Sequence, residues 1–168
     1  GGKSKHAEEC LAGNFIGTDV TGQLALGNEY DGLLIYGSSN VIGGTVAAAR
    51  NVIAANRYAV FFVNPNATGN RVIGNFIGTD VTGTNALGNN SGVVAYAAPA
   101  NLIGGEAAGE GNVISGNTNS AIYLTELIST NYVIQGNFIG TDVSGDVLLP
   151  NGSGIYVGTA GNLVGGTN

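Results

Sequence analysis

The stretch GNFIGTDV occurs three times in this chain, at residues 13–20, 74–81 and 136–143. The copies begin 61 and 62 residues apart, so a unit of that length repeats along a chain of 168 residues. A fixed period of this kind is typical of solenoids, in which each repeat buries its apolar face against its neighbours. The spacing of the shorter motifs inside the unit therefore decides the fold.

Three families of short apolar segments recur inside the repeat, each about once every 30 residues. The first family comprises GLLIY, AVFFV, GVVAY, AIYLT and GIYV, which begin at Gly32, Ala59, Gly92, Ala121 and Gly154. The second family begins at Asn40, Asn70, Asn101, Asn131 and Asn162, and the third at Asn14, Asn51, Asn75, Asn112 and Asn137. Segments rich in Val, Ile and aromatic residues and bounded by Gly or Asn are typical of β-strands joined by turns.

These families predict an all-β fold, a right-handed parallel β-helix of about five coils, with roughly 30 residues and three strands in each coil. The predicted β-helix covers residues 13–168, and we expect residues 1–12 to be a charged N-terminal segment or junction. The unit of 61 to 62 residues corresponds to two coils. One coil is compact, and the other carries a longer loop with the pattern TDVTGxxALGN.

The Asn residues that begin the second and third families are expected to form ladders along the stack. Successive coils lie about 4.8 Å apart, which lets side-chain amides hydrogen-bond to one another. Asn also tolerates the left-handed backbone conformation of sharp bends. We therefore assign a structural role to two ladders, Asn40, Asn70, Asn101, Asn131 and Asn162 in one, and Asn14, Asn51, Asn75, Asn112 and Asn137 in the other.

Alternation along each strand predicts which side chains point inward. The first family supplies two core rows, Leu33, Val60, Val93, Ile122 and Ile155, and Ile35, Phe62, Ala95, Leu124 and Val157. The second family supplies Ile42, Ile73, Ile103, Ile134 and Val164, and the third Ile16, Ile53, Ile77, Ile114 and Ile139. The residues between the first-family core positions are then expected to point into solvent.

At this point the chain resembles the right-handed parallel β-helix of the pectate-lyase-like superfold. More narrowly, its repeat is similar to the NVIxGNFIGTD arrays of large secreted or surface-attached bacterial proteins. The resemblance covers about residues 13–168, and it implies an extracellular or cell-surface location. Because this superfold carries enzymes, adhesins and structural shafts, it does not by itself define an activity.

Composition excludes several functional classes. The net charge is −6, and no Lys or Arg follows Arg71, which argues against nucleic-acid binding. No apolar run approaches the roughly 18 residues of a membrane span, so none is expected. Cys10 is the only cysteine, so the chain forms no internal disulfide, and we interpret it as a structural thiol.

Catalysis is not expected. Lyases and epimerases that this chain resembles use clustered carboxylates, often with Ca²⁺, and a basic residue. The repeated acids Asp19, Asp80 and Asp142 recur in alternate coils, about 9.6 Å apart, whereas Ca²⁺ ligands lie about 2.3–2.6 Å from the ion. We interpret them as acceptors in Asx turns, with a Ca²⁺ site as the alternative, and we predict no metal and no cofactor.

The first family is expected to show an apolar stripe to solvent. One outward row is Leu34, Phe61, Val94, Tyr123 and Tyr156, and the next is Tyr36, Val63, Tyr96, Thr125 and Gly158. A contiguous apolar stripe is typical of an interaction surface. We therefore take Tyr36, Phe61, Tyr96, Tyr123 and Tyr156 as candidate binding residues. The alternative is that the long loops or neighbouring domains cover the stripe.

The sequence favours a non-catalytic structural shaft segment of a secreted or cell-surface protein. End-to-end stacking into a filament and lateral self-association are its expected modes of assembly. The first alternative is a polysaccharide-binding module that uses the aromatic stripe. The second is a fragment of a polysaccharide lyase or epimerase.

Overall fold

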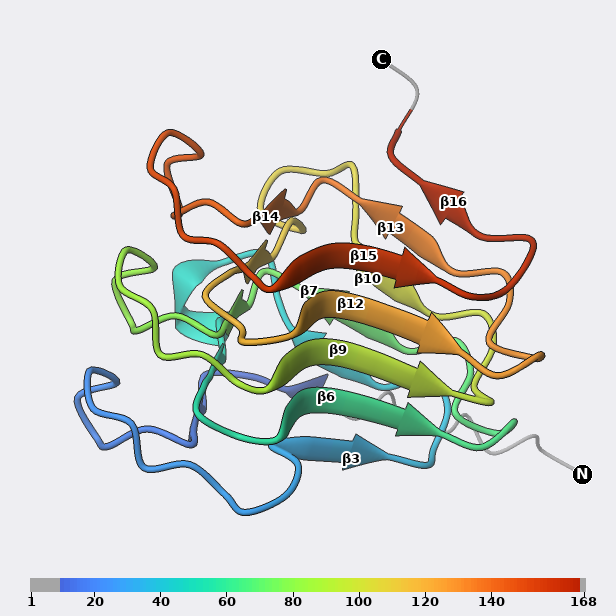
Figure 1. Ribbon diagram of the computed structural model, residues 1–168, viewed down its shortest axis with the longest axis horizontal. Coiled ribbons are helices and arrows are strands. Elements are labelled where there is room, and N and C mark those ends of the chain that lie inside the picture. Colours follow the sequence, from blue (N-terminus) through green and yellow to red (C-terminus); the bar gives the residue numbers. More distant parts are fainter. Residues whose placement is uncertain (1–9, 167–168) are drawn as a thin grey trace, which may run out of the picture.

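The computed structural model describes residues 10–166 and shows a parallel β-solenoid of about five coils, with about 31 residues per coil (Figure 1). Three parallel sheets run along the stack, and each coil contributes one strand to each sheet. The one helix of the described range is a short 3-10 turn, η1 (Ala47–Ala49). The predicted all-β fold with three strands per coil is confirmed.

The second-family segments form a six-stranded sheet, one strand more than predicted. The additional strand, β1, pairs in parallel with β4. The members of this sheet are β1 (Cys10–Leu11), β4 (Val41–Gly43), β7 (Arg71–Ile73), β10 (Leu102–Gly104), β13 (Val133–Gln135) and β16 (Leu163–Val164).

The third-family and first-family segments form one five-stranded sheet each. The third-family sheet contains β2 (Phe15–Ile16), β5 (Val52–Ile53), β8 (Phe76–Ile77), β11 (Val113–Ile114) and β14 (Phe138–Ile139). The first-family sheet has the longest strands, β3 (Leu33–Ile35), β6 (Tyr58–Val63), β9 (Ser91–Tyr96), β12 (Ser120–Thr125) and β15 (Ser153–Val157). Long adjacent strands give this sheet the broadest outer face of the three.

The core consists of aliphatic rows stacked coil upon coil, largely in the predicted register. The first-family and third-family rows pair as expected along the stack. The second-family row needs one correction, because Ile42 and Ile103 pair with Val72 rather than with Ile73. The inward residue lies two positions after the Asn in each of these coils. Two positions after Asn70 is Val72, whereas Ile73 lies three positions after it.

The third-family Asn ladder is confirmed. The Asn112 side-chain Oδ1 accepts the backbone N–H of Asn75 at 2.9 Å and its Nδ2–H at 3.0 Å. The Asn112 Nδ2 group in turn donates to Val72 O and to Asn137 Oδ1, both at 2.8 Å. The same pattern joins Asn14 to Asn51 and Asn51 to Asn75. Each rung thus ties one coil to the next through side chain and backbone together.

The second-family ladder is correct except at Asn131. Asn40 bonds Asn70, and Asn70 bonds Asn101, but the Nδ2 group of Asn101 donates to the hydroxyl of Tyr132 at 2.9 Å. Tyr132 is fully buried and occupies the ladder position of its coil, while Asn131 is exposed. The Tyr132 backbone N–H then donates to Asn162 Oδ1 at 2.8 Å, which continues the ladder.

The bend before this ladder explains the displacement. In every coil, the residue before the ladder position has a positive φ, as Ser39, Gly69, Ala100, Asn131 and Gly161 show, at 63°, 69°, 55°, 60° and 75°. The left-handed conformation therefore belongs to the preceding residue and not to the ladder Asn. Asn131 is suited to that position because Asn tolerates positive φ better than most residues.

A third ladder, which the sequence interpretation missed, runs where the chain approaches the first-family sheet. Its members are Asn28, Asn56, Asn89, Asn117 and Asn151, each joined to the next by a side-chain hydrogen bond of 2.7–3.1 Å. The steps between members alternate between 28 residues and 33 or 34. No buried side-chain N or O atom between residues 10 and 166 lacks a hydrogen-bond partner.

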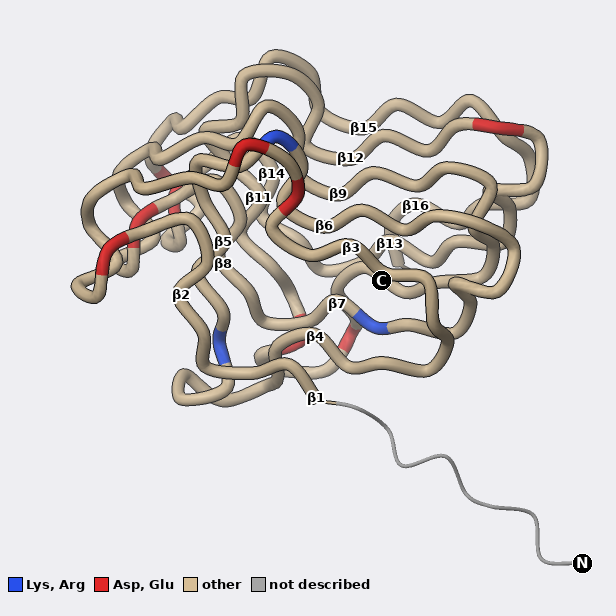
Figure 2. Tube along the Cα trace, turned by 90° about the horizontal axis from the view of Figure 1, so that it is seen from below, with Lys and Arg blue, Asp and Glu red and all other residues tan. Residues whose placement is uncertain are grey.

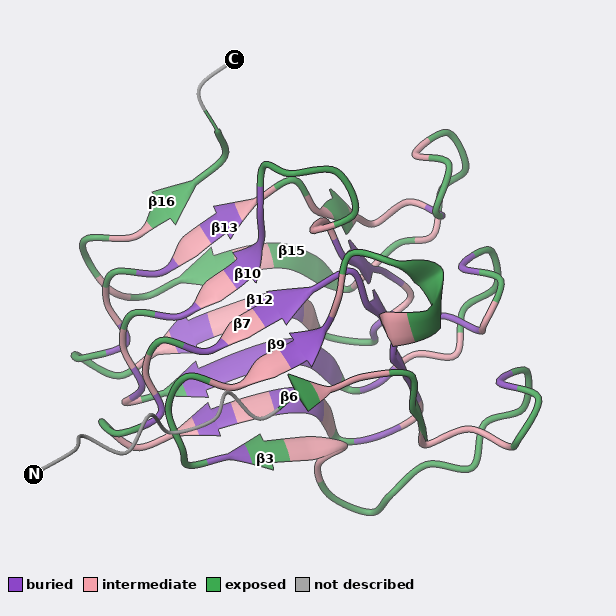
Figure 3. Ribbon diagram, turned by 180° about the vertical axis from the view of Figure 1, so that it is seen from behind, coloured by how far each residue is buried: buried purple, intermediate pink, exposed green. Residues whose placement is uncertain are grey.

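The long loops, defined as residues 18–27, 79–88 and 141–150, stack on one another beside the third-family sheet. The backbone N–H of Val81 donates to Gly22 O at 2.9 Å, and that of Val143 donates to Gly83 O at 3.0 Å. Val81 also packs on a buried cluster of Val52, Phe76 and Val113. The loop tips are exposed, whereas the strands of the interior coils are buried (Figure 3). The long loops therefore pack against the third-family sheet and not against the first-family stripe.

Replacing Asn112 with Ala is expected to lower the free energy of unfolding by about 1–3 kcal/mol, because it leaves buried N–H donors of Asn75 without an acceptor. The matched control is Asn66→Ala, since Asn66 is exposed. This control is expected to stay within about 0.5 kcal/mol of the parent. Urea unfolding followed by circular dichroism measures both. Equal stability of Asn112→Ala and the parent would show that the ladder does not stabilise the fold.

Candidate functional site

The outward side chains of the first-family sheet form a continuous row in the predicted register. The row runs, one residue per coil, through Leu34, Phe61, Val94, Tyr123 and Tyr156. Tyr96 lies in the neighbouring outward row, paired with Val63 on one side and Thr125 on the other. Because the first-family strands pair in this register, aromatic side chains from several coils meet on one surface.

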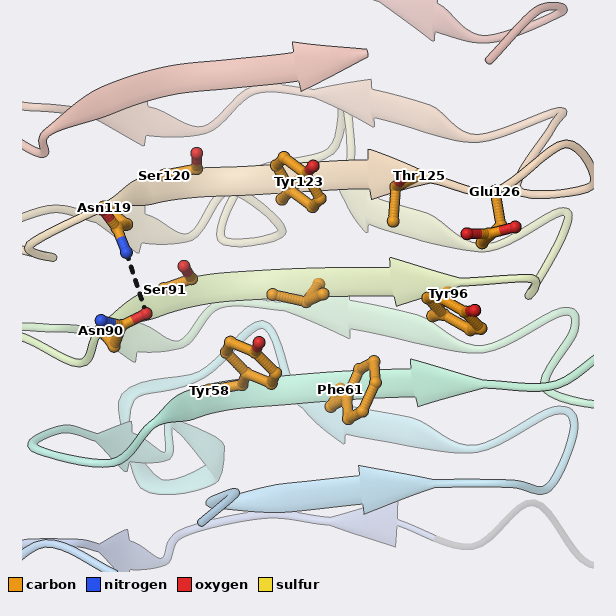
Figure 4. Close-up of a pocket in the computed structure, with 11 residues that line it drawn as sticks. Tyr58, Phe61, Asn90, Ser91, Tyr96, Asn119, Ser120, Tyr123, Thr125 and Glu126 are labelled. Atoms are coloured by element: carbon orange, nitrogen blue, oxygen red, sulfur yellow. Dashed lines mark hydrogen bonds between the residues drawn. The ribbon is translucent and has the colours of Figure 1, made fainter. Parts of the chain in front are cut away.

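Side chains on β6, β9 and β12, and on residues directly flanking β9 and β12, line an open groove of about 550 Å³ on this surface (Figure 4). Its apolar lining consists of Tyr58, Phe61, Val94, Tyr96 and Tyr123. Its polar lining consists of Asn90, Ser91, Asn119, Ser120, Thr125 and Glu126. A concave surface that combines aromatic side chains with a few polar groups is the usual form of a small-ligand site.

Aromatic stacking orders one wall of the groove. Tyr123 stacks on Tyr156 in the next coil, with ring centroids 4.6 Å apart and an angle of 18° between the rings. On the other side, Phe61 packs edge to face against Tyr58, with centroids 5.2 Å apart. Val94 lies between these walls and is 6% exposed, so the row of large side chains is interrupted at its coil.

Amide and hydroxyl groups lie where the strands of the groove begin. The Asn119 Nδ2 group donates to Asn90 Oδ1 at 3.0 Å, and both side chains are exposed (Figure 4). This bond uses one donor of Asn119 and one acceptor of Asn90. The Nδ2 group of Asn90 and the Oδ1 atom of Asn119 have no protein partner within residues 10–166, so they are available to a ligand.

Charge is scarce at the groove. Strands β6, β9 and β12 carry no charged residue (Figure 2). Glu126, which is exposed, is the one charged residue that lines the groove (Figure 4). Arg57 lies over the ring of Tyr58 at 5.0 Å from its centroid. Partial burial raises the pKa of the nearby Asp31 carboxyl, and the charge of Arg57 opposes this shift. The groove therefore presents a mostly uncharged surface.

The structure brings three of the five predicted binding residues together in the groove. Phe61, Tyr96 and Tyr123 line it, whereas Tyr36 and Tyr156 lie outside its lining, with exposed fractions of 56% and 50%. Sequence reasoning missed the residues that precede the apolar part of each strand, namely Tyr58, Asn90, Ser91, Asn119 and Ser120. A recurring polar pair before the strand, NS in residues 90–91 and again in 119–120, is the signal that could have identified them.

The repeated aspartates accept hydrogen bonds inside the long loops, as predicted. One Asp19 carboxylate oxygen accepts the backbone N–H groups of Gln23 and Leu24 at 3.0 Å, and the hydroxyl of Thr21 donates to the same carboxylate. Asp80 and Asp142 accept the corresponding groups of their own loops. No three His, Cys, Asp or Glu side chains between residues 10 and 166 converge as metal ligands would.

These hydrogen bonds depress the pKa values of the loop aspartates. The backbone N–H of Leu24 and the Thr21 hydroxyl lower the pKa of Asp19 to about 2. The Ser144 hydroxyl is the main cause of the lowered pKa of Asp142. At Asp80, burial acts to raise the pKa, but donors from Asn85 and Thr82 outweigh it and the pKa is lowered. All three aspartates are therefore held as anions that stabilise their turns.

The arginines of the described chain make separate local contacts. Arg71 forms an ion pair with Glu110 at 2.7 Å. Arg50 lies over the Phe76 ring at 4.1 Å from its centroid, and its Nε donates to Gly74 O. The basic positions are scattered in Figure 2 rather than gathered into one patch. His6, Lys3 and Lys5 lie outside the described residues.

Comparison of this chain with models of protein families, with curated proteins and with solved structures gives no match. Within residues 10–166, no helix has the length and apolar character needed to cross a bilayer. We therefore base the functional inference on the geometry of the groove.

The loop aspartates are expected to make stability depend on pH in the acid range. Asp19 has a folded-state pKa below its unfolded value of 3.8, so its contribution is complete above about pH 4 and is lost as the pH falls towards 2. Nuclear magnetic resonance titration of the Asp19 carboxyl should give a midpoint near 2.

Thr21→Val removes the hydroxyl donor and keeps the backbone donors, so it should raise that midpoint part of the way to the ordinary value. A midpoint that is ordinary in the parent, or unchanged in Thr21→Val, would contradict the assigned hydrogen bonds.

Proposed function

We propose that this chain is a non-catalytic β-solenoid segment of a secreted or cell-surface protein that binds a polysaccharide at the first-family groove. The groove is the observation that carries this proposal. It offers exposed aromatic faces, an amide pair with a free donor and a free acceptor, and hydroxyl groups at both ends. Sugar rings combine apolar C–H faces with peripheral hydroxyl groups, so this combination suits them.

The shape of the sheet favours a polymer over a compact ligand. The groove is open and crosses three coils, and the outward aromatic row continues beyond it to Tyr156. A linear glycan can lie across successive coils and exit at either end. A small closed ligand would leave most of this surface uncovered.

The contacts of the acidic residues support a non-catalytic role. Hydrolysis of a glycosidic bond commonly uses a pair of carboxylates on either side of that bond. The groove has one carboxylate, Glu126, at its rim, and the three repeated aspartates are engaged by hydrogen bonds in the long loops. Arg71 is engaged by an ion pair and Arg50 by a backbone acceptor, while Arg57 lies over the Tyr58 ring.

The proposed location rests on the repeat itself. The NVIxGNFIGTD pattern resembles arrays in large secreted or surface-attached bacterial proteins of the pectate-lyase-like superfold. A solenoid with low charge, many Asn and Gly residues and ladders that run along the stack is suited to a long, rigid surface projection.

A structural shaft is the second candidate function. Three Asn ladders and fully paired buried polar groups within the described chain favour it, because they make a rigid stack without any ligand. Self-association, end to end or side by side, stays a prediction of this candidate. Light scattering of the purified chain over a range of concentrations checks it.

A glycan array followed by titration calorimetry tests the binding function. The parent chain should bind at least one linear polysaccharide, and Tyr123→Ala should weaken that binding by about tenfold, or about 1.4 kcal/mol, because it removes a stacking face. Tyr30→Ala is the matched control, since Tyr30 is exposed outside the groove. Its affinity should equal that of the parent.

Absence of binding to every neutral, acidic and amino-sugar chain on the array would contradict the binding function and leave the shaft as the better account. Circular dichroism of each variant verifies that the fold is retained.

A further inference from the structure

We infer that the space above Val94, between Phe61 and Tyr123, is a slot for one sugar ring of an uncharged polysaccharide. This space is called the ring slot below. The inference rests on the proposed polysaccharide binding and adds to it the position of one sugar ring and the charge class of the ligand.

The strand register determines the width of the ring slot. Phe61 pairs with Val94, and Val94 pairs with Tyr123, so Phe61 and Tyr123 are separated by two strand spacings, about 9.6 Å. Tyr123 and Tyr156, one spacing apart, already stack with centroids 4.6 Å from one another. A flat ring above Val94 would therefore lie one strand spacing from Tyr123, which is the spacing at which Tyr123 and Tyr156 already stack.

The ring slot exists because Val94 is small. The coils on either side carry large aromatic residues at this position, and Val94 is nearly buried beneath the level of its neighbours. The short side chain leaves the Tyr123 ring face without a stacking partner on the Val94 side. The floor of the ring slot is aliphatic, which suits the C–H face of a sugar.

Polar groups are placed to bind the edge of such a ring. Asn90 and Asn119 lie at the end of the groove where the strands begin, and the Nδ2 group of Asn90 and the Oδ1 atom of Asn119 are left for a ligand. Ser91 and Ser120 add hydroxyl groups beside them, and Thr125 adds one towards the opposite end. Amides and hydroxyls can each donate and accept, as the hydroxyl groups of a neutral sugar require.

Charge favours an uncharged glycan. The groove lining contains no Lys or Arg, and its one charged residue is the acidic Glu126. Arg57 lies beside the lining, over the ring of Tyr58. Because Glu126 is exposed, its repulsion of an acidic sugar is weakened by solvent. The lack of a cationic partner among the groove residues is the stronger argument, since recognition of a carboxylate generally uses such a partner.

The test places a larger protein side chain in the ring slot, where it would exclude the sugar ring. Val94→Tyr should extend the tyrosine stack, keep or raise the melting temperature, and weaken binding at least tenfold. The matched control is Leu34→Tyr, which adds a tyrosine to the same row, outside the groove. The control should bind as the parent does. Val94→Leu, which fills part of the slot with a smaller side chain than tyrosine, should weaken binding to a lesser extent and provides a second variant if Val94→Tyr does not fold.

The probes are cellohexaose, mannohexaose and xylohexaose as uncharged chains and hexagalacturonate as the acidic chain, each measured by titration calorimetry. The expected result is at least tenfold tighter binding of one uncharged probe than of hexagalacturonate, with loss on Val94→Tyr. Folded Val94→Tyr that binds as tightly as the parent would overturn the ring slot and leave polysaccharide binding intact. If Val94→Tyr does not fold, a folded Val94→Leu that binds as tightly as the parent would overturn the slot.

Tighter binding of hexagalacturonate would overturn the charge assignment. Failure of the parent to bind any probe, together with a blank glycan array, would overturn the proposed function and the ring slot with it.

Discussion

The hydrogen bond between Asn side-chain amides of neighbouring coils is the interaction on which this structure depends. At a typical rung, one Oδ1 atom accepts both the backbone N–H and the Nδ2–H of the Asn in the adjacent coil. This two-point contact fixes the axial position of a bend, and three such ladders fix three bends in each coil. A slip of one residue would reverse every side chain of the affected strand, so the ladders also determine which residues face outward.

The candidate site follows from this register. The first-family strands contribute Phe61, Val94 and Tyr123 to one outward row because the bends before them are aligned. The long loops contribute by packing elsewhere, on the third-family sheet, where Val81 covers Phe76. The centre of one sheet is thus packed against its own chain, while the first-family sheet presents aromatic side chains to solvent.

Much of the fold could be predicted because each coil needs the same three strands, inward apolar residues and bends. Apolar residues and Asn recur at a nearly constant interval, so the sequence predicts the strands, the core rows and two of the Asn ladders. The failures have local causes. Asn131 was placed in a ladder because both the left-handed bend and the ladder position accept Asn, and only the strand register shows that Tyr132 occupies the ladder. The third ladder was hidden by loops of unequal length, which make its steps alternate.

The groove was only partly predictable for a related reason. Outward aromatic residues follow from alternation, but Tyr58, Asn90 and Asn119 precede the apolar segments, and their proximity depends on pairing across coils. A crystal structure with a bound uncharged oligosaccharide tests the account most directly. The account predicts a sugar ring above Val94, stacked on Tyr123 and in contact with Phe61. A ring bound away from Val94, or a register in which Phe61 and Tyr123 point into the core, would contradict it.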